Sequence, residues 1–137
     1  MLDDFLGEYC DWKHEQNDPV EFAPDEKGNY WLVLQDCLQR VSVSLIQIQD
    51  SQDDHAIVVE SAVGKWSDQL DVRSLLLMSG SKMLISRFSL CPRDLEDILV
   101  VESAVPYQSI TLPLFDRMIR EVMSLVTHLL TPARVEE

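Results

Sequence analysis

Hydrophobic and polar positions change their spacing several times along the chain, and each spacing predicts a different element. In the N-terminal stretch "MLDDFLGEYCDWKHEQ" the apolar residues recur at steps of three and four. These residues are Leu2, Phe5, Leu6, Tyr9 and Trp12. Because that spacing places side chains on one face of a helix, the stretch predicts an amphipathic helix.

The spacing changes to two after a loop that carries several helix breakers. The segment "NDPVEFAPDEKGN" contains two prolines and a glycine, and it predicts a loop with a short extended piece at Val20–Phe22. In "YWLVLQDCLQRVSVSLIQIQ" apolar and polar residues alternate in two separate runs, which predicts two strands. After Leu45 the apolar positions shift to Ile46 and Ile48, which indicates a bulge or a strand covered on both faces.

Strands and helices alternate in the rest of the chain. The segment "HAIVVESAV" predicts a strand that ends at Gly64, and "SDQLDVRSLLLMS" predicts a helix that Gly80 stops. The segments "SKMLISRFSL" and "ILVVESAV" predict two more strands, joined by a loop, "CPRDLED". A last helix runs from Leu112 to about Leu130, with Thr111 as its cap. The order helix, three strands, helix, two strands, helix predicts an α+β fold in one domain over residues 1–131, followed by a charged tail over residues 132–137.

Two nearly identical heptapeptides, "IVVESAV" at Ile57–Val63 and "LVVESAV" at Leu99–Val105, occupy the second strand of each predicted hairpin. Their β-branched residues suit a half-buried strand. No chemistry recurs beyond Glu60 and Glu102, and two copies are too few for a repeat array. We therefore interpret the repeat as part of the architecture rather than as a pair of ligand sites.

Charge and composition narrow the function classes. The chain has 137 residues and a formal net charge of −13, which disfavours binding to nucleic acid or to anionic membranes. No apolar run reaches the length of a membrane span, and the N-terminus lacks the pattern of a signal peptide. Three widely spaced cysteines without a C-x-x-C pair are typical of reduced thiols, so we expect a cytoplasmic protein.

Catalytic and metal-binding motifs are not evident in the sequence. The chain has no nucleophile-elbow motif, no phosphate-binding glycine loop and no H-E-x-x-H, so we expect a protein that is not an enzyme and has no cofactor. Cys10 and His14 lie four residues apart and could supply half of a metal site, with His128 as a further ligand. Helix packing is the commoner reason for such a pair, and we predict no metal.

The second predicted helix has more apolar residues than one buried face requires. In "LDVRSLLLMSG" they run almost around the helix, at Val72, Leu75, Leu76, Leu77 and Met78. A helix that is apolar on more than one side has two faces to bury, and in a small chain the second face favours contact with another subunit. The alternative is that loops or the first helix cover that face. We predict a homodimer with these residues at its interface.

The chain resembles the class I type III secretion chaperones of Gram-negative bacteria, the small acidic proteins of the Tir-chaperone type. Three stretches carry the resemblance: "NYWLVLQDCLQRVSVSLIQIQ", "IVVESAVGKWSDQLDVRSLLLMSG" and "ITLPLFDRMIREVMSLVTHLL". They are similar to the early sheet, to the strand and leucine-rich helix, and to the closing helix of that family. The resemblance covers nearly all of residues 1–131 and implies a twisted, mainly antiparallel sheet packed by helices.

The resemblance also implies a function. A cytoplasmic homodimer would bind the extended N-terminal segment of a secreted effector protein and keep it soluble and competent for export. The residues that we expect to bind this partner are Phe5, Leu6, Tyr9, Trp12 and Trp31, with plain core packing as the alternative for each. A second possibility is a regulatory adaptor of the same fold that sequesters another cytoplasmic protein.

Overall fold

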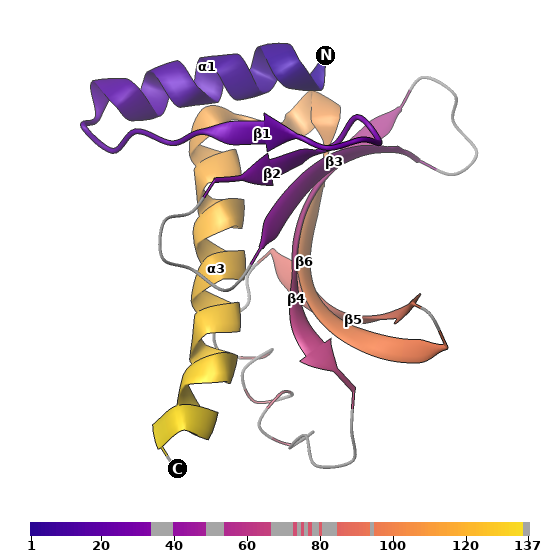
Figure 1. The fold of residues 1–137 in the computed structure, drawn as a ribbon. Coiled ribbons are helices and arrows are strands. Elements are labelled where there is room, and N and C mark those ends of the chain that lie inside the picture. The colour runs from indigo at the N-terminus through magenta and orange to yellow at the C-terminus, as the bar shows by residue number, and fades with distance from the viewer. Residues whose placement is uncertain are drawn as a thin grey trace.

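An antiparallel sheet of six strands forms the centre of the molecule (Figure 1). The computed structural model describes residues 1–33, 40–48, 54–66, 73, 75, 77, 80, 85–93 and 95–135. In spatial order the strands are β1 (Phe22–Pro24), β2 (Tyr30–Leu32), β3 (Val41–Gln47), β4 (His55–Lys65), β6 (Glu96–Pro106) and β5 (Ser86–Arg93). Helix α1 (Leu2–Glu15) precedes the sheet, while a short 3-10 turn, η1 (Tyr107–Ser109), and helix α3 (Leu112–Val135) follow it. The predicted α+β fold is confirmed.

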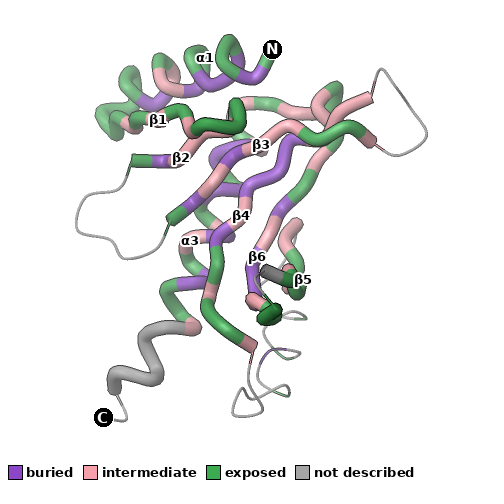
Figure 2. The backbone as a smooth tube through the Cα atoms, turned by 45° about the vertical axis from the view of Figure 1, so that its right-hand side comes forward, coloured by how far each residue is buried: buried purple, intermediate pink, exposed green. Residues whose placement is uncertain are grey.

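One face of the sheet packs against both helices and forms the core. Directly paired residues of an antiparallel sheet lie on the same face, and successive residues of a strand alternate between faces. On the inner face Val43 of β3, Val59 of β4 and Val101 of β6 have no exposed surface. Burying each such side chain contributes about 1.5–3 kcal/mol. Figure 2 shows buried residues recurring along β3, β4 and β6 and along one side of α1.

Helix α1 forms where the three-and-four spacing predicts it. Its buried residues are Leu2, Phe5, Leu6, Tyr9 and Lys13. The Phe5 and Tyr9 rings meet Phe115 of α3 edge to face, with ring centroids at 5.2 and 4.8 Å. Such aromatic pairs add about 0.5–1.5 kcal/mol beyond the area that they bury. The apolar stripe of α1 is therefore matched by an aromatic residue at the start of α3.

Helix α3 has the predicted start but a later end. The hydroxyl oxygen of Thr111 accepts a hydrogen bond from the backbone N–H of Leu114 at 3.2 Å, which confirms Thr111 as the N-cap. The helix continues to Val135 instead of ending near Leu130. The helical backbone therefore continues past Pro132 into the segment that we predicted as a tail.

The two heptapeptides are adjacent antiparallel strands at the centre of the sheet. Glu60 of β4 lies directly opposite Glu102 of β6, and Ile57 lies opposite Val105. Each heptapeptide therefore pairs with the other in reverse order, and their alternating residues supply both faces of the central strand pair. Like charges opposite one another are unfavourable, and Arg87 of β5 offsets this because its Nε donates to Glu102 Oε1 at 2.7 Å. This pairing agrees with our interpretation that the repeat is part of the architecture rather than a pair of ligand sites.

Two details of the predicted strands are wrong. The expected bulge after Leu45 is absent, since β3 pairs with β4 without interruption from Val41 to Gln47. Ile46 is 50% exposed, so the apolar residues at the end of this strand do not require cover on both faces. The bulge lies instead in β4, between Ala62 and Gly64. Gly64 has a φ of 153°, a conformation that glycine adopts more readily than other residues.

The segment "CPRDLED" is a hairpin rather than a loop. Strand β5 continues to Arg93 and β6 begins at Glu96, with Cys91 opposite Ile98 and Pro92 opposite Asp97. Pro92 fits because β5 is at the edge of the sheet, where a missing N–H costs little. Both strands therefore extend into the segment that we predicted as a loop.

The second predicted helix is described at four positions. Arg73, Leu75, Leu77 and Gly80 are all helical. Gly80, the residue that we expected to end the helix, is itself helical, and residues 81–84 lie outside the described residues. The rest of this segment, including Val72, Leu76 and Met78, lies outside the described residues.

The serines at the fifth position of the two heptapeptides allow a matched test of one hydrogen bond. Ser61 is 2% exposed and Ser103 is 1% exposed. The Ser103 hydroxyl donates to the carbonyl oxygen of Ile85 at 3.1 Å, whereas the Ser61 hydroxyl has no partner among the described residues. We expect Ser103→Ala to lower the free energy of unfolding by about 1 kcal/mol, and Ser61→Ala to leave it unchanged or raise it slightly. Urea denaturation measures both effects, and equal losses in the two variants would contradict this assignment.

Candidate functional site

A hollow of about 910 Å³ lies between the C-terminal half of α1, the segment that leads into β1, strand β2 and helix α3. We call it the α1–α3 groove. The described residues that line it are Tyr9, Lys13, Asp18, Pro19, Val20, Glu21, Leu32, Val33, Asp116, Ile119, Arg120 and Met123. Its volume lies in the range of about 300–1,000 Å³ that is usual for ligand pockets. The groove is therefore large enough to receive several side chains of a partner.

The apolar part of the groove comes from three elements that are distant in sequence. Val20 precedes β1, Leu32 ends β2 and Val33 follows it, and Ile119 and Met123 belong to α3. Leu32 and Ile119 are buried, whereas Val33 is 45% exposed. An exposed aliphatic side chain beside buried ones provides an apolar surface that a partner can cover.

The polar wall of the groove is a buried network around Asp116. The Tyr9 hydroxyl donates to Asp116 Oδ1 at 2.6 Å, and Lys13 Nζ donates to the same oxygen at 3.2 Å. Arg120 Nε lies 2.8 Å from the other oxygen, Oδ2. Lys13 Nζ also donates to Asp18 Oδ2 at 2.6 Å. Asp116 and Lys13 are 7% and 3% exposed, so two opposite charges are buried together and satisfy each other.

The electrostatic effects of this network follow from its geometry. Burial raises the pKa of the Tyr9 hydroxyl strongly, and the hydrogen bond to Asp116 raises it further. Burial by itself lowers the pKa of Lys13, but the hydrogen bonds to Asp18 and Asp116 outweigh it, so the pKa is raised overall. The hydrogen bond from Lys13 lowers the pKa of Asp18. Tyr9 therefore remains a donor and Lys13 remains charged at neutral pH.

The turn after α1 positions Asp18 at the groove. Asn17 has a φ of 60°, the left-handed conformation that often ends a helix. The N–H of Asp18 bonds to the carbonyl of Lys13, and the N–H of Asn17 bonds to that of His14, both at 3.1 Å. This pair of bonds is a Schellman motif. It returns the chain over the last turn of α1, so that the Asp18 carboxylate reaches the Lys13 ammonium.

The partner-binding residues predicted from the sequence are not brought together. Phe5, Leu6 and Tyr9 are all buried in the core, at 8%, 3% and 1% exposure. Of the predicted set, Tyr9 is the residue that the groove lining includes. Trp12 is half-buried next to Tyr9, with ring centroids 5.9 Å apart. A binding role for Phe5, Leu6 and Trp12 stays a prediction.

Trp31 lies on the other face of the sheet. It pairs with Ser42 of β3, which pairs with Glu60, and this row lies on the face opposite α1 and α3. The guanidinium of Arg40 lies 5.7 Å from the centre of the Trp31 ring, within the range of a cation–π contact. Trp31 and Tyr9 therefore cannot contribute to one groove.

Sequence reasoning missed the two charged residues at the centre of the network. Lys13 follows Tyr9 by four residues, on the apolar face of α1, and Asp116 directly follows Phe115. The position of Lys13 on the apolar face of the predicted helix could have indicated this network, since a buried charge requires a partner. The identity of that partner depends on how α1 packs on α3.

The predicted dimer interface is described in part. Leu75 is 7% exposed and Leu77 is 62% exposed. Val72, Leu76 and Met78 lie outside the described residues. The interface stays a prediction, and Leu77 is the described member with the most accessible surface.

Three further features bear on function. Among the described residues, no group of three or more histidine, cysteine, aspartate or glutamate side chains is arranged to hold a metal ion. Cys10 and Cys91 are free thiols, while Cys37 lies outside the described residues. None of the helices in the described part of the chain is both long and apolar enough to span a membrane.

The network around Asp116 predicts a large effect of removing its carboxylate. We expect Asp116→Ala to lower the free energy of unfolding by about 3–5 kcal/mol, because it leaves the buried Lys13 without one of its partners. The matched control is Glu96→Ala, which removes the exposed pair that Glu96 makes with Lys65 at 3.0 Å. That change should cost less than about 1 kcal/mol. Equal effects in urea denaturation would show that the Asp116 network contributes no more than a surface ion pair.

Comparison with known proteins establishes the fold. No protein-family model and no curated protein sequence matches the chain. Among solved structures, the Yersinia pestis type III secretion chaperone SycH, in complex with a stable fragment of YscM2, aligns with a TM-score of 0.57 at 13% identity, covering 89% of this chain and 97% of that chain. YbjN from E. coli, a proposed transcription regulator, also aligns with a TM-score of 0.57 at 13% identity, covering 97% of this chain and 91% of that chain. This chain therefore has the fold that SycH and YbjN share.

Proposed function

We propose that this chain is a non-enzymatic protein-binding module that holds an extended segment of a partner protein in the α1–α3 groove. The observation that supports it is the groove itself, in which an accessible apolar surface lies beside a rigid charged wall. The exposed Val33 and the adjoining Met123 offer the apolar surface, and Asp116 holds the wall in place.

An extended partner suits this groove better than a small metabolite. Strand β1 is at the edge of the sheet, next to the groove, and an added strand can bond to the backbone of an edge. The carbonyl oxygen of Glu21 accepts a hydrogen bond from the N–H of Val33 at 2.8 Å, which joins the groove residues to this edge. Alternate side chains of an added segment would point into the groove.

Within this class, we propose a cytoplasmic secretion chaperone that keeps an effector segment soluble and competent for export. The fold shared with SycH, a type III secretion chaperone solved with a fragment of YscM2, supports this proposal. The net charge of −13 also supports it, because strong self-repulsion favours solubility.

A regulatory adaptor is the second candidate, and the likeness to YbjN supports it. Both candidates use the same groove and differ in the partner. The partner that copurifies with the chain distinguishes them: a secreted protein favours the chaperone, and a protein retained in the cell favours the adaptor.

We expect Val33→Asp to weaken binding of the copurified partner at least tenfold, since it places a charge in an apolar contact. The control is Ile46→Asp. Ile46 is similarly exposed, at 50% against 45% for Val33, but it does not line the α1–α3 groove. Fluorescence anisotropy with peptides that tile the partner measures both variants. Equal weakening, or binding only of a folded partner domain, would contradict the proposal.

We also propose a homodimer that uses the second helix. Leu77→Asp should convert the dimer to a monomer, because a buried unpaired charge costs several kcal/mol, on the order of the stability of a small interface. Light scattering at a fixed protein concentration measures the change, again with Ile46→Asp as the control. A wild-type chain that is monomeric, or a Leu77→Asp dimer of unaltered mass, would contradict the dimer.

A further inference from the structure

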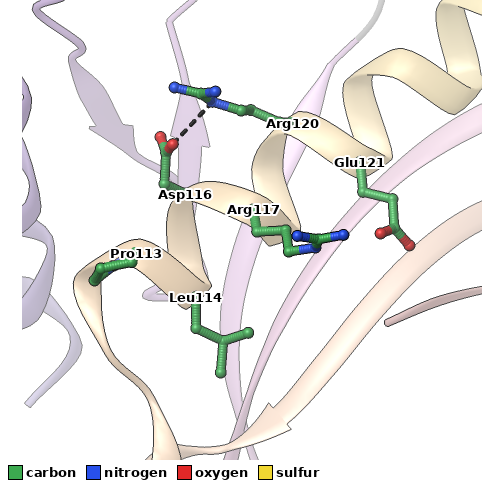
Figure 3. A pocket seen from close by; sticks show the side chains of 6 residues that line it. All are labelled: Pro113, Leu114, Asp116, Arg117, Arg120 and Glu121. Atoms are coloured by element: carbon green, nitrogen blue, oxygen red, sulfur yellow. Dashed lines mark ion pairs between the residues drawn. The ribbon is translucent and has the colours of Figure 1, made fainter. Parts of the chain in front are cut away.

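A second hollow of about 610 Å³ lies along the first turns of α3 (Figure 3). Its described lining residues are Pro113, Leu114, Asp116, Arg117, Arg120 and Glu121. Asp116 and Arg120 also line the α1–α3 groove. The two hollows are therefore neighbours that share one wall, the ion pair between Asp116 and Arg120. We call the second hollow the arginine hollow.

Both carboxylates of the arginine hollow are already engaged. Asp116 accepts hydrogen bonds from Tyr9 and Lys13 and pairs with Arg120. Glu121 Oε1 accepts the backbone N–H groups of Ile85 and Ser86 at 3.1 and 2.9 Å. These bonds hold the negative charges in fixed positions.

The two arginines of the hollow keep donors for a ligand. Arg120 is 70% exposed and pairs with Asp116 through Nε, one of the five N–H groups of a guanidinium. Arg117 is exposed and makes no ion pair or side-chain hydrogen bond with any described residue. Figure 3 shows the two side chains pointing apart, Arg120 towards Asp116 and Arg117 towards the side of the hollow where Glu121 lies. Arg117 can therefore offer its whole guanidinium group to one carboxylate.

Two exposed arginines in one hollow are unusual in a chain with so many acidic residues. The sequence has 11 basic residues against 24 acidic ones. Exposed arginines on a convex helix surface would be ordinary solvated charges, but here they flank a hollow with Pro113 and the half-buried Leu114. At physiological ionic strength charges are screened over about 8 Å, so acidic residues elsewhere on the surface contribute little to the field at Arg117.

We propose that the arginine hollow binds an aspartate or glutamate side chain of the segment that occupies the α1–α3 groove. This inference rests on the proposed function, since the groove has to bind the apolar part of the same segment. A carboxylate suits the site because a guanidinium can donate two parallel hydrogen bonds to it. The shared wall means that the acidic residue lies close in sequence to the apolar residues that fill the groove. The segment thus has a defined pattern, apolar residues followed or preceded by an acidic one.

The probe for this proposal is a phage-displayed library of random dodecapeptides, selected on the full-length chain. We expect the wild type to enrich peptides with aliphatic residues and a nearby aspartate or glutamate. Arg117→Glu should enrich the same aliphatic pattern with lysine or arginine in place of the acidic residue. Lys27→Glu is the matched control, since it makes the same change in charge at an exposed loop position outside both hollows. It should retain the wild-type pattern.

A selected acidic peptide then gives a quantitative test. Its dissociation constant should rise roughly tenfold in Arg117→Gln, the amount expected for losing one charge-assisted hydrogen bond. Replacing the acidic residue of the peptide by its amide should have the same effect on the wild type and little effect on Arg117→Gln. Enrichment of aliphatic peptides with no acidic preference, or with one that Arg117→Glu does not change, would overturn the arginine hollow but not the groove. No enrichment by any variant would overturn both.

Discussion

The buried carboxylate of Asp116 is the group on which the position of α1 depends. It joins residues that are 107 and 103 positions away in sequence, Tyr9 and Lys13, and holds Arg120 at its other oxygen. A carboxylate buried without such partners would be strongly unfavourable. A buried ion network adds little to stability compared with apolar residues of the same size, but it tolerates few geometries. The network thus joins α1 to α3 at Tyr9 and Lys13, next to the ring contacts of Phe5 and Tyr9 with Phe115.

The geometry of both hollows follows from that attachment. Lys13 continues the network to Asp18, which holds the turn after α1 against the groove. Arg120 continues it in the other direction and separates the α1–α3 groove from the arginine hollow. A rigid charged wall with an accessible apolar surface on one side and unused guanidinium donors on the other can select a partner by pattern. Preorganised walls of this kind lower the entropic cost of binding.

The sheet supplies the platform for this arrangement. Its centre is the pair of similar strands β4 and β6, whose inner residues, among them Val59 and Val101, are fully buried against α3. Its edges are β1, beside the groove, and β5. The outer face carries the row from Trp31 to Arg87, which has a different chemical character from the groove. A substitution on the outer face can therefore change contacts there without changing the residues of the groove.

The sequence by itself determined the elements and most of their order, because the spacing of apolar residues reflects local backbone geometry. Helix α1, the cap at Thr111 and the strands around both heptapeptides follow from it. Only the tertiary structure decided what each apolar face contacts. Spacing shows that Phe5 and Tyr9 share a helix face, but not that both are buried in the core or that the Tyr9 hydroxyl bonds to Asp116 beside the groove. The pairing of Lys13 with Asp116, and the separation of Trp31 from the groove, depend on packing between distant elements, which a local pattern does not contain.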